Sequence, residues 1–112
     1  MVGLKPGLGP VVFVLCLLAA PLAAHAEALS AADVSLMAAS CMNCHGPQGV
    51  SPGAMASIAG RTEPEIAQML IAYRAGTIPG ATVMTRIMKG FDDAEITALA
   101  RYYAALPAGG AR

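Results

Sequence analysis

Between residues 30 and 107, apolar positions recur three and four residues apart, which is the period of an α-helix with one buried face. Three of these stretches begin with a residue pair typical of a helix N-terminus, in which a side-chain oxygen accepts from a backbone N–H. The pairs are Ser30 with Asp33, Thr62 with Glu65, and Asp92 with Glu95. Gly76 and Pro107 are typical helix stops, and a short apolar piece spans residues 83–88. This pattern predicts an all-α fold.

Two loops separate the predicted helices. Glycine and proline cluster between residues 46 and 60, and again at residues 76–80, where no regular period is visible. The sequence shows neither an internal repeat nor the alternating pattern of a β-strand. We therefore expect a small domain of helices joined by long loops.

The N-terminal segment has a different character. Its only charged side chain is Lys5, a continuous apolar run covers residues 11–20, and it ends in the sequence Ala-His-Ala at residues 24–26. This order is typical of a cleavable secretory signal. The alternative, an uncleaved membrane anchor, is disfavoured because a spanning helix needs about 20 apolar residues. We predict a signal peptide over residues 1–26, export to the periplasm, and no membrane span after processing; Cys16 leaves with the signal.

The processed chain, residues 27–112, has few large apolar side chains. Only 26 of these residues are apolar and larger than alanine, and the segment contains one Phe and no Trp. A domain this small is marginally stable unless something reinforces its core. Its six basic and seven acidic residues show no excess of positive charge, which excludes a nucleic-acid partner. We expect a bulky apolar group to complete the core.

The motif that supplies such a group is Cys-Met-Asn-Cys-His at residues 41–45. The pattern C-x-x-C-H is the attachment sequence of c-type haem, whose vinyl groups form thioethers with the two cysteines. Cys41 and Cys44 would bind the haem covalently, and His45 would be the proximal iron ligand. A thioredoxin-like redox pair would need a βαβ setting, and a zinc site would need further Cys or His residues. We therefore predict one covalently bound haem c.

The second axial ligand must be a side chain other than histidine, because His45 is the only histidine of the processed chain. Methionine is the usual alternative in electron-transfer haem proteins. The candidates are Met37, Met42, Met55, Met69, Met84 and Met88. The first two lie on or beside the proximal helix, Met55 follows His45 closely, and Met69 falls on a helical stripe that we expect in the core. Met84 and Met88 remain, one helical turn apart.

Several segments resemble a known family. The C-x-x-C-H motif with a later methionine is similar to class I cytochrome c. The segments TVMTRIMKGF at residues 82–91, DDAEI at 92–96 and YRAG at 73–76 resemble the cytochrome subunit of flavocytochrome c sulfide dehydrogenase and its small monohaem relatives. The resemblance implies a class I cytochrome c fold over residues 27–112. It also implies that Met84 is the distal ligand, with Met88 as the alternative.

The chain departs from the family pattern at Ala56, where relatives often have proline. This departure leaves open which carbonyl orients the imidazole of His45, and Pro52 is the alternative source. Arg86 is a candidate contact for the haem propionates, as are Arg74 and Lys89, because partly buried carboxylates need cationic partners.

Six-coordinate iron with His and Met ligands favours a one-electron carrier over an enzyme, because no coordination position is open for a substrate. The resemblance implies a flavoprotein sulfide dehydrogenase subunit as the electron donor. The alternative is a freely diffusing cytochrome c that serves an oxidase, a reductase or another dehydrogenase. A third hypothesis is an open iron site that binds a small ligand.

Overall fold

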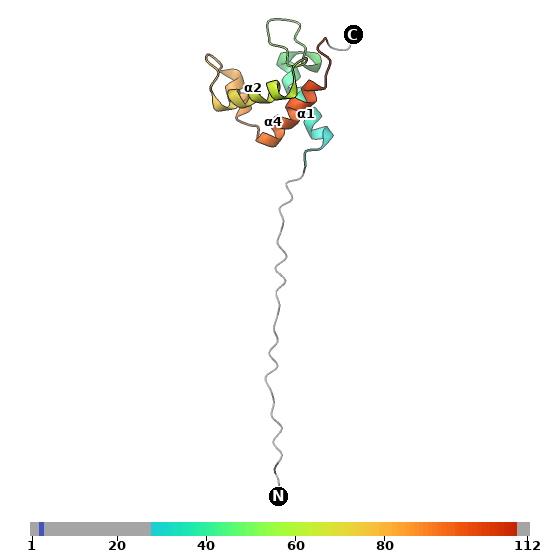
Figure 1. Ribbon diagram of the computed structural model, residues 1–112, viewed down its shortest axis with the longest axis vertical. Helices are drawn as coiled ribbons and strands as arrows, with labels where there is room; N and C mark the ends of the chain where they lie inside the picture. The colour runs from blue at the N-terminus through green and yellow to red at the C-terminus, as the bar shows by residue number, and fades with distance from the viewer. Residues whose placement is uncertain (1–2, 4–27, 110–112) are drawn as a thin grey trace.

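The computed structural model describes residue 3 and residues 28–109, and in this part of the chain the fold is helical, with no β-strand. The elements are α1 (Ala31–His45), the 3₁₀ turn η1 (Pro47–Gly49), α2 (Glu63–Ala75), α3 (Val83–Met88) and α4 (Asp93–Ala104). Figure 1 shows α1, α2 and α4 gathered into one body with a long loop after α1 at its edge. The predicted all-α class is confirmed. The predicted signal peptide, residues 1–26, lies outside the described residues apart from Gly3.

The helices begin where the capping signals predicted. Both hydrogen bonds of a capping box form at Ser30–Asp33, at Thr62–Glu65 and at Asp92–Glu95. At α2, for example, Glu65 Oε2 accepts from Thr62 N at 2.8 Å and from Thr62 Oγ1 at 2.7 Å. These bonds stabilise the carboxylate and lower the pKa of Glu65 below its ordinary value, with the hydroxyl contributing most. Local sequence therefore fixes where each of these helices starts.

The core forms where α4 packs against α1 and α2, and α3 packs against α2. Its buried hydrophobic residues are Ala38, Ala59, Ile66, Met88, Ile96, Leu99, Ala100 and Tyr103. Helix α4 supplies four of these eight, all on one face, as its apolar spacing predicted. Three of the eight are alanines, so the described core contains little bulky side-chain volume.

Tyr103 ties the first helix to the last. Its hydroxyl donates to the Ala38 carbonyl at 2.7 Å in the buried core. Burial raises the pKa of Tyr103, so the hydroxyl keeps its proton and remains a donor. The Tyr103 ring also lies where a side chain on Gly49 would stand, because a Cβ there would approach the ring to 2.7 Å. Gly49 therefore lets the η1 turn lie close to α4.

None of the helices in residues 28–109 is long and apolar enough to cross a membrane.

Helix α4 ends at Ala104, slightly before Pro107, which the sequence pattern predicted as its stop. The amides of Ala105 and Leu106 still bond to the carbonyls of Arg101 and Tyr103, which continues the helical turn after the helix itself has ended.

Replacing Tyr103 with phenylalanine tests the contact between α1 and α4. We expect the Tyr103→Phe variant to unfold with a free energy about 1 kcal/mol lower than wild type, because one buried hydrogen bond is lost while the ring stays. Guanidinium denaturation of the haem-loaded protein measures this difference. Tyr102→Phe is the matched control, since Tyr102 packs edge-on against Tyr103 and its hydroxyl forms no hydrogen bond within the described residues. Equal losses in the two variants would contradict the assignment.

Candidate cofactor site

A cleft opens between α1, α2, α3 and the loop that follows η1. Its larger part is a cavity of about 400 Å³, within the range of roughly 300–1,000 Å³ that is usual for ligand sites. The larger part is lined by Ser40, Cys41, Cys44, His45, Met55, Ala56, Ile58, Leu70, Tyr73, Val83, Met84, Ile87, Met88, Leu99 and Tyr103. A smaller part shares His45, Ala56, Ile58, Leu70, Tyr73 and Met84 with it, so the two are continuous. The lining is mostly apolar.

The last turn of α1 brings the three motif residues to this cleft. Cys41, Cys44 and His45 stand three and four positions apart, which places them on one helix face, and all three line the larger cavity. Cys41 is half-buried, Cys44 is exposed, and both are free thiols. This donor set fits a haem c: two thiols at one edge of an apolar cavity and an imidazole beside them.

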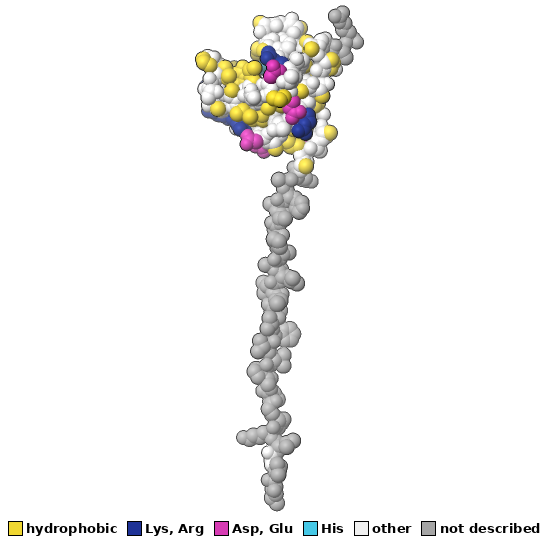
Figure 2. Space-filling view, in the orientation of Figure 1, with side chains coloured by type: hydrophobic (Ala, Val, Ile, Leu, Met, Phe, Trp, Pro, Cys, Tyr) yellow, Lys and Arg dark blue, Asp and Glu magenta, His cyan; other side chains and the backbone are white. Residues whose placement is uncertain are grey.

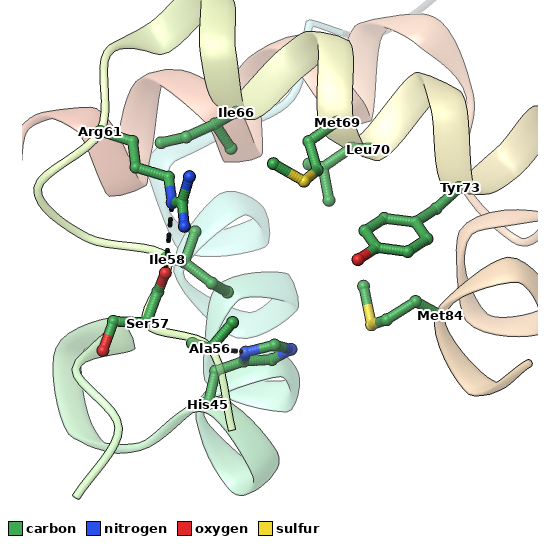
Figure 3. Close-up of a pocket in the computed structure, with 10 residues that line it drawn as sticks. All are labelled: His45, Ala56, Ser57, Ile58, Arg61, Ile66, Met69, Leu70, Tyr73 and Met84. Atoms are coloured by element: carbon green, nitrogen blue, oxygen red, sulfur yellow. Dashed lines mark hydrogen bonds between the residues drawn. The ribbon is translucent and has the colours of Figure 1, made fainter. Parts of the chain in front are cut away.

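The orientation of His45 is set by the loop. Its Nδ1 lies 2.6 Å from the carbonyl oxygen of Ala56, and Figure 3 shows the ring projecting from that bond into the cavity. A carbonyl only accepts, so Nδ1 carries the proton, and Nε2 is left with the lone pair that a metal requires. The orienting carbonyl is therefore that of Ala56 rather than that of Pro52. Alanine can replace the proline that relatives often have at this position, because the hydrogen bond to His45 uses only the backbone carbonyl.

The loop that carries this carbonyl is closed by its own hydrogen bonds. The Gly49 carbonyl accepts from the amides of Ile58 at 2.8 Å and Ala59 at 3.1 Å. Farther along, the Ser57 hydroxyl accepts from the Ser51 amide at 2.9 Å. These contacts form a neck that holds residues 51–57 against the end of α1. The Ala56 carbonyl is thereby presented to the His45 ring.

Helix α3 brings methionines to the other side of the cleft. Met84 lines both parts of the cavity, and Figure 3 shows it facing His45 across the open space, with the Tyr73 hydroxyl directed toward it. Met88 also lines the larger part but is only 2% exposed, as expected of a core residue. Met69 was predicted in the core, and this prediction is wrong: it is 37% exposed and lines the smaller part of the cleft. Figure 3 shows Met69 on α2, at the edge of this cleft.

The three basic residues considered for the haem propionates, Arg74, Arg86 and Lys89, are not among the residues that line the cleft. Arg86 is exposed in the last turn of α3 and is not among the residues that line the cleft. Arg74 donates to the Phe91 carbonyl at 3.1 Å and pairs with Asp93, so it joins α2 to the start of α4. Arg61, which the sequence analysis missed, does line the smaller part of the cleft. The sequence contains a feature that could have indicated this position, because Arg61 is the one charged residue between His45 and Thr62.

Two comparisons with known proteins bear on this site. The family model described as cytochrome c matches residues 31–106. Cytochrome c-553 of Nitratidesulfovibrio vulgaris is 31% identical over 99 residues, which cover 85% of this chain and 97% of that protein. The cytochrome subunit of sulfide dehydrogenase of Chlorobaculum tepidum is 35% identical over 68 residues, or 61% of each protein. The chain thus spans less than two thirds of the second relative.

Replacing Gly46, which directly follows His45, tests whether the turn at the end of α1 requires glycine. Its φ of 84° and ψ of 165° lie in a region that only glycine adopts readily, and a Cβ there would stand 2.1 Å from the Val50 carbonyl oxygen. We expect Gly46→Ala to lower the free energy of unfolding of the haem-loaded protein by about 2 kcal/mol or more, as measured by guanidinium denaturation. Gly53→Ala is the control, because a Cβ at Gly53 meets nothing within 4 Å. Similar stabilities for the two variants would contradict this role of Gly46.

Proposed function

The chain belongs to the cytochrome c family, whose domain carries a covalently bound haem c, and on that premise we propose that it is a periplasmic one-electron carrier with His45 and Met84 as iron ligands. Cys41 and Cys44 would form the thioether bonds. The observation that carries this proposal is the placement of His45 and Met84 on opposite sides of one apolar cleft, with both thiols at its edge.

When bound, the haem supplies reversible one-electron transfer at its iron. The residues of the chain determine how that chemistry is used. Ligands from both His45 and Met84 would leave no coordination position for a substrate, which supports a carrier rather than an enzyme. A methionine thioether raises the reduction potential. The apolar lining favours the ferrous state as well, since a buried positive charge is costly in such surroundings.

The mouth of the cleft offers a surface for a redox partner. Met55, Val83 and Ile87 line the larger cavity, yet they are 51%, 63% and 45% exposed. Exposed apolar groups that gather at a cavity mouth are typical of protein–protein contact sites. Figure 2 shows one face of the molecule, on which hydrophobic side chains are scattered among uncharged surface and basic groups lie beside acidic ones. Docking would thus depend on apolar contact, because near-zero net charge gives weak long-range attraction.

The proposed electron donor is a flavoprotein sulfide dehydrogenase subunit. The Chlorobaculum relative, named as the cytochrome subunit of such an enzyme, supports this partner. Sulfide oxidation would then take place on the partner, and this chain would accept the electrons singly. The alternative, a freely diffusing cytochrome c that serves another redox enzyme, is supported by the cytochrome c-553 relative, which matches over nearly its full length. In both cases the signal peptide predicted for residues 1–26 would deliver the chain to the periplasm.

Replacing each of the two methionines of α3 with alanine tests which of them is the distal iron ligand. We expect Met84→Ala to abolish the weak red absorption band that a thioether gives with ferric iron, and to lower the reduction potential. Met88→Ala should keep the band and lose about 2–5 kcal/mol of unfolding free energy instead, because it leaves a cavity in the core. Optical spectra and denaturation of the two haem-loaded variants give both results. Loss of the band in Met88→Ala alone would make Met88 the ligand.

Charge placed at the cleft mouth tests the docking surface and the partner. The haem-loaded protein is purified from the periplasm of its native host, and sulfide-dependent reduction by a co-purifying flavoprotein is followed optically. We expect Val83→Asp to slow this reduction about tenfold, which corresponds to a docking penalty of about 1.4 kcal/mol. Leu36→Asp should leave the rate unchanged, because Leu36 is 75% exposed on α1 and does not line the cleft. Equal rates in both variants would contradict docking at the mouth, and purification without any flavoprotein would favour the free carrier.

A further inference from the structure

The larger and smaller parts of the cleft are lined by different kinds of side chain. Cys41 and Cys44 line only the larger part, whereas Arg61 lines only the smaller part. His45 and Met84, the proposed iron ligands, line both parts. A planar group attached at the cysteine end and centred between His45 and Met84 would therefore extend its far edge toward Arg61.

The porphyrin of haem also has one apolar half and one anionic half. Its vinyl groups occupy one half of the ring and its two propionates occupy the other half. Thioether bonds at Cys41 and Cys44 would direct the vinyl half toward those residues. The anionic half would then point to the smaller part of the cleft, where Arg61 is the one arginine or lysine among the lining residues.

Arg61 has donors free for a carboxylate. Its Nε donates to the Ser57 carbonyl at 3.4 Å, and Figure 3 draws this bond on the side of the cavity away from Met84. In the described part of the chain, carboxylates pair with Arg74 and Arg101, and none forms an ion pair with Arg61. Its acidic neighbour Glu65 accepts two bonds from Thr62, and although Arg61 contributes to the lowered pKa of Glu65, the two form no ion pair. The terminal NH₂ groups of Arg61 therefore remain for a ligand, and guanidinium binds carboxylates in a bidentate fork.

Arg61 also reaches the proximal ligand through the backbone. The Ser57 carbonyl that it holds belongs to the residue next to Ala56, whose carbonyl orients His45 at 2.6 Å. A shift of the guanidinium would thus reach the backbone beside the Ala56 carbonyl that accepts from His45. The strength of that hydrogen bond tunes the basicity of a metal-bound histidine.

We propose that Arg61 binds a haem propionate and, through Ser57 and Ala56, restrains the ring of His45. The proposal rests on the proposed function, since it requires the haem attached at Cys41 and Cys44. Arg61 is a positioning residue in this scheme. It links the anionic edge of the cofactor to the proximal hydrogen bond.

The test compares Arg61→Gln, Arg61→Lys and Arg86→Gln in the haem-loaded protein. We expect Arg61→Gln to shift the resonance Raman band of the propionate bending vibration and to lower the reduction potential, because a cation near the iron is lost. The Nδ1 proton of His45, followed by NMR in the ferrous state, should exchange several-fold faster. Arg61→Lys should retain most of the potential but not the wild-type Raman band, because lysine lacks the planar fork. Arg86→Gln is the matched control and should change none of the three.

Each readout can overturn one part of the proposal. An unshifted propionate band in Arg61→Gln, or an equal shift in Arg86→Gln, removes the propionate contact. Unchanged exchange of the His45 proton removes the positioning role. The mass and the red absorption band of the wild-type protein are recorded first. A wild-type chain without covalent haem would contradict the proposed function itself, whereas a normal wild type with inert Arg61 variants contradicts only this inference.

Discussion

The constraint on which the structure depends is the apolar cleft that the chain forms but does not fill. Eight hydrophobic side chains are buried in the described part, and only Ile66, Met88, Ile96, Leu99 and Tyr103 among them are larger than alanine. A domain of this size with so small a core has little stabilisation of its own. In the proposed function, the haem of the cytochrome c family would supply a large apolar body at that place. The site would then be both the functional centre of the molecule and the missing part of its core.

Much of this architecture could be predicted from the sequence because the determining interactions are local. The capping boxes at Thr62 and Asp92 join residues three positions apart, so the sequence shows them directly. The C-x-x-C-H motif is equally local. In contrast, Arg74 donates hydrogen bonds to the Phe91 carbonyl and the Asp93 carboxylate, which lie 17 and 19 residues away in the sequence. The helical period of apolar residues does not predict such distant partners. The same holds for the Ala56 carbonyl and for Met69, whose exposure depends on which helices happen to cover α2.

In the proposed function, the short helix α3 combines two roles on one side, because Val83, Met84 and Ile87 all line the larger part of the cleft. Met84 points into the cleft toward His45, while Val83 and Ile87 remain exposed at its mouth. In the proposed function, the residue that ligates the iron and the residues that meet the partner lie within a few positions of one backbone. A redox partner would thus contact the protein at a short distance from the distal ligand, which shortens the path an electron has to travel.

The contact between Tyr103 and Ala38 has a consequence for the order of events during biosynthesis. Helix α4 provides half of the buried core of the described residues, yet of the helices in residues 28–109 it is the last to be synthesised. Before it appears, α1 has only the short η1 turn to pack against, and an isolated helix of 15 residues is only marginally stable in water. The two thiols would therefore lie in an open, accessible chain while it emerges in the periplasm, where the predicted signal peptide would deliver it. Covalent attachment would take place in that interval, and the arrival of α4 would then close the protein shell around the haem.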